Sequence, residues 1–212
     1  MDQASEHQPG PGQSPPPPVA APAPPWRGKW LALAIITVVC VGLDQGTKHW
    51  AQTDLQHRLT RHVTLIDGYL KLSYVRNPGA AWGFLARSHR SFRRPFFIGI
   101  SIVAMLFILY LFRRLEPGQR LMMTALSLVM GGAIGNFIDR IRFNYVVDFI
   151  DFHVQRRFKW PTFNVADIAI TVGVALLFLE MFVLPRLRRR RQRAAARAVA
   201  AEGVDRDRGE GA

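Results

Sequence analysis

The chain has 212 residues, of which 49% are hydrophobic, and its 28 Lys and Arg outnumber its 15 Asp and Glu. The charged residues gather between long apolar blocks, a pattern typical of membrane proteins, where basic side chains contact anionic lipid headgroups. This arrangement argues against a nucleic-acid-binding protein. The single cysteine, Cys40, excludes an internal disulfide and a cysteine-based metal site.

The first 25 residues are rich in Pro and Ala and cannot bury enough apolar surface to fold, so we expect a disordered leader over 1–25. Apolar blocks follow at about 30–50, 95–112, 121–138 and 163–184. Each is close to the roughly 20 residues that cross a bilayer as a helix. The sequence therefore predicts a four-helix membrane domain over 26–185, followed by a basic, disordered tail over 186–212.

The long link between the first two spans contains a predicted β-hairpin. Residues 69–76 alternate between apolar and polar side chains, which is typical of a strand. Residues 62–66 can pair with them across the turn at Asp67-Gly68. The link over 140–162 is polar and aromatic.

The basic residues give mixed information about orientation. Up to residue 197, the side that holds both tails carries 12 Lys and Arg, against 14 on the opposite side. The positive-inside rule gives most weight to short segments next to the spans, and the densest of these is Arg186–Arg193. We therefore expect both termini to lie in the cytoplasm.

Polar residues that are unusual for membrane spans converge on the face opposite the tails. Because the spans alternate in direction, the end of the first, the end of the third and the start of the fourth lie on this face. Ionisable groups at membrane depth are expensive and face a bundle interior or a watery cavity. The converging residues are Asp44, Lys48, Asn77, Asn136, Asp139, Arg140, Asp148, Asn164 and Asp167.

Several of these residues also have structural interpretations. Asp44 and Lys48 are four apart, so they share a helix face and could form only an ion pair. Arg140 could extend to lipid headgroups, and Asn77 could serve only to form a turn, with no part in a site. We expect Asp139 and Asp151 to be solvated or interfacial acids and not catalysts.

Two carboxylates are the leading chemistry, because the sequence has no Gly-x-Ser-x-Gly or His-Glu-x-x-His motif. Asp148 and Asp167 could meet, share one proton and activate water for peptide hydrolysis without a metal or cofactor. Two alternatives stay open at this point. The acids could belong to a small proton-coupled transporter or channel subunit, or they could join Asp151 and His153 in a metal site.

Five stretches, in order along the chain, resemble the lipoprotein signal peptidase (signal peptidase II) family. They are DQGTK (44–48), NPGAAWGF (77–84), GGAIGNFIDR (131–140), VVDFIDF (146–152) and FNVADIAI (163–170). Trp82 departs from the Phe that is usual in the family. The resemblance implies a mainly α-helical membrane protein with four transmembrane helices and a small periplasmic β-sheet cradle.

The resemblance also implies an activity. The expected enzyme removes signal peptides from diacylglyceryl-modified prolipoproteins in the bacterial inner membrane, cleaving before the lipid-modified Cys at the periplasmic face. The resemblance places the catalytic pair on Asp148 and Asp167, and it implies sensitivity to globomycin-type inhibitors. We expect a monomer with no cofactor, no metal and no nucleic-acid partner. Supporting or substrate-binding positions are implied at Asp44, Lys48, Asn77, Gly132, Asn136, Arg140, Asn164 and Ala166.

Overall fold

A computed structural model describes residues 28–60, 62–79, 89–155, 157–187 and 192. Its long helices are α1 (Gly28–Thr53), α2 (Arg90–Arg113), α3 (Arg120–Phe143) and α4 (Val165–Phe178). A short 3-10 turn, η1 (Leu55–His57), follows α1, and a π-helical turn, η3 (Leu179–Val183), extends α4. The predicted leader, nearly all of the predicted tail, and Trp82 lie outside the described residues.

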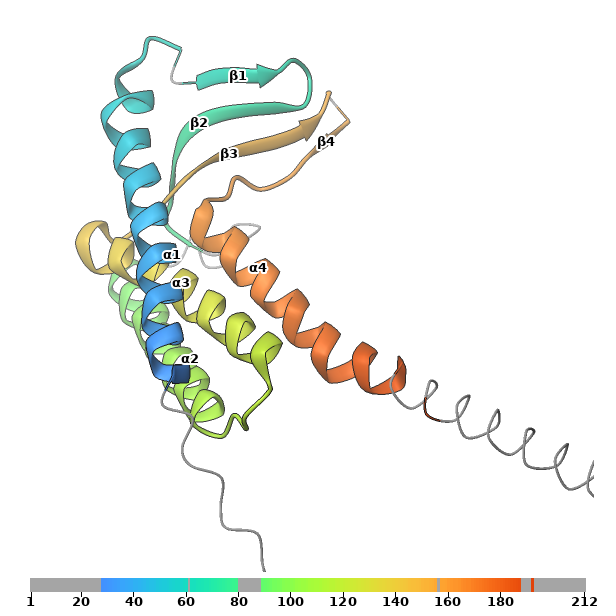
Figure 1. Cartoon of the computed structure of the whole chain (residues 1–212). Helices are drawn as coiled ribbons and strands as arrows, with labels where there is room; N and C mark the ends of the chain where they lie inside the picture. Colours follow the sequence, from blue (N-terminus) through green and yellow to red (C-terminus); the bar gives the residue numbers. More distant parts are fainter. Residues whose placement is uncertain (1–27, 61, 80–88, 156, 188–191, 193–212) are drawn as a thin grey trace, which may run out of the picture.

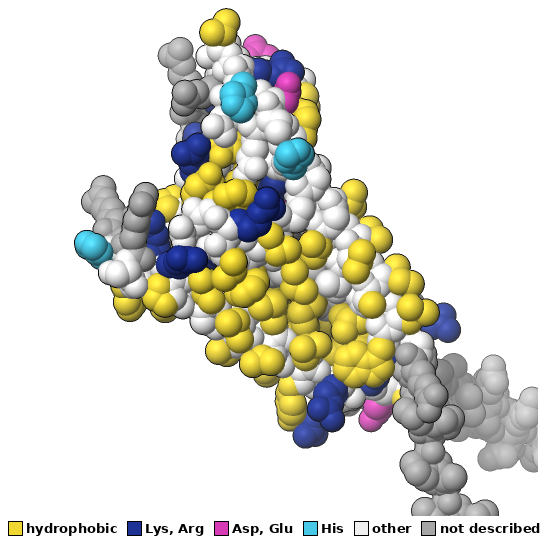
Figure 2. All heavy atoms as spheres, turned by 90° about the vertical axis from the view of Figure 1, so that its left-hand side faces the viewer, with side chains coloured by type: hydrophobic (Ala, Val, Ile, Leu, Met, Phe, Trp, Pro, Cys, Tyr) yellow, Lys and Arg dark blue, Asp and Glu magenta, His cyan; other side chains and the backbone are white. Residues whose placement is uncertain are grey.

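Four helical stretches are long and apolar enough to cross a membrane, at Gly28–His57, Ser91–Arg113, Arg120–Phe143 and Val165–Leu187. The prediction of four spans is therefore confirmed. Their apolar side chains form a broad hydrophobic belt, with Lys and Arg side chains above and below it (Figure 2). α2 begins at Arg90, ahead of the predicted start at Pro95. The prediction counted apolar residues and therefore omitted the arginine-rich first turns.

A four-stranded antiparallel sheet lies at one end of the helices, beside the start of α4 (Figure 1). The strands β1 (His62–Ile66), β2 (Leu70–Asn77), β3 (Val146–Val154) and β4 (Phe158–Lys159) are neighbours in that order. The predicted hairpin is β1–β2, and Gly68 at its turn has a φ of 75°, which glycine adopts without strain. The small sheet expected from the family resemblance is thus present.

The link over 140–162 contains a strand that the residue pattern did not predict. α3 ends at Phe143, and the left-handed backbone of its C-cap residue Asn144 (φ 64°) closes the helix and turns the chain toward the sheet. β3 follows at once, and its first four residues are all buried. A strand buried on both faces does not alternate, so the period-two signal is missing.

α3 packs against α1, α2 and α4, and small residues permit close approach to two of them. A Cβ on Gly132 would press against the backbone carbonyl of Ala166 and lie 2.7 Å from Ile170 Cγ1. A Cβ on Gly135 would press against the Asp44 carboxylate. These contacts hold the first turn of α4, including the fully buried Ala166, close to α3.

We predict that Gly132→Ala destabilises the protein by about 1–3 kcal/mol, because overpacking against backbone cannot relax easily. Thermal unfolding of the purified protein in detergent would show a lower Tm. Gly42→Ala is the matched control, since a Cβ there meets no atom within 4 Å. An equal Tm for Gly132→Ala and wild type would contradict the close packing of α3 and α4.

Candidate active site

Asp148 and Asp167 come from different elements that meet beside the sheet. Asp148 lies in β3 opposite Val75 of β2, and it is 1% exposed. Asp167 lies in the first turn of α4 and is half-buried. Phe163 joins the two elements, because it forms a bridge with Ile150 of β3 through backbone hydrogen bonds of 2.9 and 3.1 Å. The residues just before α4 are therefore aligned with the strand that carries Asp148.

Asn164 contacts both acids. Its Nδ2 donates to Asp148 Oδ1 (2.7 Å), and its Oδ1 accepts a hydrogen bond from the backbone N–H of Asp167 (3.0 Å). Asp167 Oδ2 in return accepts from the backbone N–H of Asn164 (3.2 Å), which completes a capping box at the start of α4. The local sequence rule that begins the helix therefore also fixes Asp167 relative to Asp148.

Two further amides hold the other carboxylate oxygens. Asn77 Nδ2 donates to Asp148 Oδ2 (2.9 Å), while Asn77 Oδ1 accepts from the backbone N–H of Gly79 (3.0 Å). Asn77 thus forms the turn proposed as its structural interpretation and also binds the acid. Asn136 Nδ2 donates to Asp167 Oδ1 (2.8 Å). Each carboxylate is consequently fixed by two different residues.

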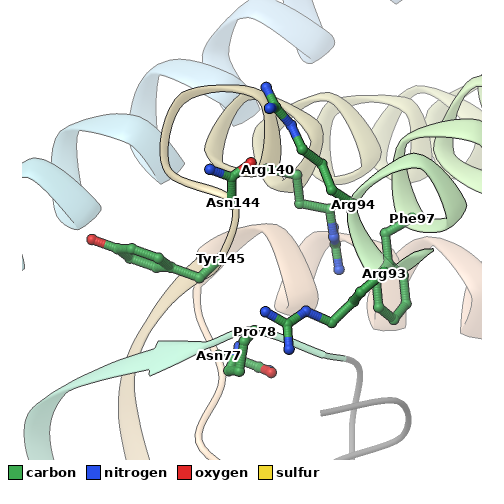
Figure 3. A pocket seen from close by; sticks show the side chains of 8 residues that line it. All are labelled: Asn77, Pro78, Arg93, Arg94, Phe97, Arg140, Asn144 and Tyr145. Carbon is green, nitrogen blue, oxygen red and sulfur yellow. The ribbon is translucent and has the colours of Figure 1, made fainter. Parts of the chain in front are cut away.

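Arg140 lies at the rim of this network, beside a small pocket (Figure 3). Within the described residues, its side-chain hydrogen bond goes to Asn136 O of its own helix (3.2 Å). Its guanidinium lies 5.1 Å from the centre of the Phe97 ring. Arg94 extends away from Asn77 in this view. Arg140 is therefore placed to meet a ligand beside the acids, although no direct bond to either acid forms.

A cavity of about 680 Å³ lies between the helices, and both acids line it. Its polar lining includes Asn77, Asn136 and Arg140, together with the acids. Apolar residues of α2 and α4 line much of the rest, among them Ile100, Ile168 and Val172. These three side chains are also 54%, 42% and 44% exposed on membrane-spanning helices. The cavity thus combines a pair of acids with an apolar flank on the lipid side.

Burial and, to a smaller extent, the charge of Asp167 raise the pKa of the Asp148 carboxyl from its ordinary value of 3.8 to about 7. Hydrogen bonds from Asn77 and Asn164 and the charge of Lys48 act in the opposite direction. Desolvation therefore outweighs the stabilisation of the ionised form. Asp148 can hold a proton near neutral pH, as a member of a carboxyl pair must.

The acids that we expected to be solvated are buried, and this expectation was wrong. Asp139 is 1% exposed and Asp151 is 2% exposed. Asp139 lies 3.1 Å from Lys48 Nζ, which also lies 2.8 Å from Asp44 as the four-residue spacing predicted. Sequence reasoning missed Asp139 as a member of this cluster, although its place one turn after Asn136 on the same helix was a usable signal.

The alternative metal site requires Asp148, Asp151 and His153 to face one ion together with Asp167. Asp148 and Asp151 are three residues apart in β3, and side chains at odd spacing point to opposite faces of a strand. Asp151 instead lies 3.5 Å from both Lys71 and Lys159. Among the residues that the structure describes, no group of three or more His, Cys, Asp or Glu is placed to hold a metal ion.

Four apolar spans and two acids that line one cavity define a polytopic membrane protein with a candidate site of the aspartic type. The family model described as signal peptidase (SPase) II matches residues 36–183, and the chain belongs to this family of membrane aspartic peptidases. It is therefore an enzyme and a multi-pass bacterial membrane protein. This membership does not support the transporter or channel alternative.

Similar proteins cover the helical core of the chain. A lipoprotein signal peptidase of Geobacter metallireducens is 45% identical over 148 residues, covering 70% of this chain and 88% of the relative. One from Syntrophotalea carbinolica is 46% identical over 150 residues, covering 71% and 90%. A bacterial membrane enzyme solved by the in meso method at 1.9 Å resolution superposes with a TM-score of 0.63 at 31% identity, covering 74% of this chain and 95% of that chain.

We predict that stability depends on the ionisation of Asp148. Its pKa is higher in the folded protein than the ordinary 3.8, so its contribution to stability is fully present below about pH 4 and is lost as pH rises through about 7. Asp148→Asn cannot ionise and should lose less Tm between pH 5 and pH 8 than wild type does. Thermal unfolding at both pH values measures this difference, and identical losses would contradict the raised pKa.

Proposed function

We propose that this protein removes signal peptides from diacylglyceryl-modified prolipoproteins, cleaving before the lipid-modified Cys with Asp148 and Asp167 as its catalytic pair. Membership in the signal peptidase II family and the names of its relatives support the reaction and the substrate class. The observation that carries the residue assignment is the network in which Asn164 contacts both acids at the edge of the large cavity.

In the proposed mechanism, the two acids share one proton. The ionised carboxylate takes a proton from water as the water oxygen attacks the scissile carbonyl carbon, and the protonated acid donates a hydrogen bond to the carbonyl oxygen. The tetrahedral intermediate then collapses, the C–N bond breaks, and the leaving nitrogen receives a proton from the pair. The products are a carboxylate and an amine, and no covalent enzyme intermediate forms.

The other residues of the site have supporting roles in this proposal. Asn77, Asn136 and Asn164 hold the carboxylate oxygens in place through the hydrogen bonds described above. Arg140 lines the cavity beside the acids and is suited to bind carbonyl oxygens of the substrate. Gly132 and Ala166 keep α4 close to α3, and Asp44 and Lys48 form a buried ion pair behind the site.

The apolar flank of the cavity supports a substrate that carries acyl chains. Ile100, Ile168 and Val172 line the cavity and are also exposed at the lipid side, so acyl chains could lie between α2 and α4 while the peptide reaches the acids. Cyclic peptide inhibitors of the globomycin type would occupy the same space. We further propose a monomer. We also propose that both termini lie in the cytoplasm and that the sheet and acids lie at the periplasmic face, an orientation that the Arg186–Arg193 cluster supports.

We predict that Asp148→Asn and Asp167→Asn each lower cleavage at least about a hundredfold while the protein still inserts, because each removes one half of the proton-transferring pair. The measurement is gel analysis of a diacylglyceryl-modified prolipoprotein incubated with purified enzyme. The control is Asp54→Asn, which should retain wild-type cleavage. Asp54 is an exposed acid that follows the end of α1 and pairs with Arg58. Substantial cleavage by either dyad variant would refute the assignment.

Treatment with a metal chelator tests the alternative chemistry. A carboxyl pair that activates water directly needs no metal, so we expect a chelator at about 10 mM to leave the cleavage rate unchanged. The same gel assay measures this rate before and after dialysis against chelator. Loss of cleavage that added divalent metal restores would show that the acids act as metal ligands.

A further inference from the structure

A buried ion cluster behind the acids consists of Asp44, Lys48 and Asp139, with exposures of 0%, 2% and 1%. Lys48 Nζ lies 2.8 Å from Asp44 Oδ2 and 3.1 Å from Asp139 Oδ2, and it donates to Asn136 Oδ1 (3.0 Å). Gln45 Nε2 donates to Asp44 Oδ2 and Asp139 Oδ1, each at 3.1 Å. The cluster joins α1 to α3 and does not line the cavity, so it cannot contact a substrate there.

Two hydrogen bonds leave this cluster toward the backbone. Asp44 Oδ1 accepts from the N–H of Ala166 (2.9 Å), and Asp139 Oδ2 accepts from the N–H of Val147 (2.9 Å). Ala166 and Val147 are the residues that immediately precede the two acids of the site, and both are fully buried. One ion cluster therefore fixes the chain directly before Asp167 in α4 and directly before Asp148 in β3.

A third connection passes through Asn136. An ammonium group can only donate hydrogen bonds, so Lys48 requires the amide oxygen of Asn136 to face it. The amide nitrogen is then turned toward Asp167 Oδ1, to which it donates (2.8 Å). Asn164 Nδ2 donates to the same amide oxygen of Asn136 (3.2 Å), so loss of Lys48 would leave one donor in place of two to hold this orientation of the amide.

We propose that Asp139, together with Asp44 and Lys48, is a positioning residue that sets the relative placement and the electrostatic environment of the catalytic pair. The inference rests on the proposed function of Asp148 and Asp167. It assigns Asp139 a role in the reaction although Asp139 touches neither the substrate cavity nor the acids. Asp44 and Lys48 act through the backbone and through Asn136.

The charges around Asp148 make the pH–activity profile a test of the inference, because a purely structural role of the cluster would leave this profile unchanged. Asp148 is faced by Lys48 from α1, Arg140 from α3 and Asp167 from α4. Lys48 lowers the pKa of Asp148, and the carboxylates of Asp44 and Asp139 lie 2.8 and 3.1 Å from this cation. Removal of the negative charge of Asp139 should therefore favour the ionised form of Asp148 and shift the pH–activity profile toward lower pH.

The test compares Asp139→Asn with Asp151→Asn, using a diacylglyceryl-modified prolipoprotein as substrate. Asp151 is the matched control, because it is equally buried and paired with lysines but lies on the other face of β3 from Asp148. We expect Asp139→Asn to lower kcat about tenfold or more, since small misplacements of reacting groups are costly, with KM nearly unchanged. Its pH–activity profile should shift down by about half a unit. Asp151→Asn should retain the wild-type kcat and profile per folded molecule.

Two outcomes would overturn the inference. One is a wild-type kcat and pH profile for Asp139→Asn, and the other is an equal change in Asp151→Asn. If Asp139→Asn does not fold, Gln45→Leu decides the matter, because it removes the hydrogen bonds from Gln45 that join Asp44 to Asp139 and leaves every charge in place. A kcat several-fold lower then supports the inference, and an unchanged kcat refutes it. Failure of the proposed function would look different, since Asp148→Asn itself would then retain cleavage.

Discussion

Lys48 can only donate hydrogen bonds, and its ammonium group meets three buried acceptors at one point of the structure, on Asp44, Asp139 and Asn136. Removing Lys48 would leave two carboxylates without a counter-charge in a low-dielectric interior, which costs several kcal/mol. The acceptors therefore hold α1 and α3 in a fixed relation. The start of α4 and the start of β3 are fixed to the same group through Ala166 and Val147. The geometry of the acidic pair depends on this interaction.

The membrane explains why such a cluster is concentrated at one end of the bundle. In the hydrocarbon region, side chains that face lipid are apolar, as the belt in Figure 2 shows, and unpaired polar groups are expensive. The polar network instead lies beside the sheet, where the end of β2, the end of α3 and the N-cap of α4 supply amide groups for every carboxylate oxygen of Asp148 and Asp167. Close packing at Gly132 and Gly135 excludes lipid from the same region.

The spans, the hairpin and the convergence of polar residues could be predicted from sequence, because each rests on a local period or on alternating direction. The strand β3 could not, since its first four residues are buried on both faces and read as a continuous apolar run interrupted by Asp148. The burial of Asp139 could not be predicted either. Its partners are the Lys48 ammonium, 91 positions away, the Gln45 side-chain amide and the backbone N–H of Val147, and a backbone amide has no signature in sequence.

The position of the cavity's apolar flank between α2 and α4 bears on which substrate concentration governs the proposed reaction. Its lining at Ile100, Ile168 and Val172 is exposed on spanning helices, so under the proposed function a lipid-anchored peptide would reach the acids by lateral diffusion without leaving the bilayer. Encounter is then a two-dimensional process, and saturation follows the mole fraction of substrate among the lipids. Dilution with inert lipid or detergent would weaken apparent binding at constant bulk concentration, whereas added water would not.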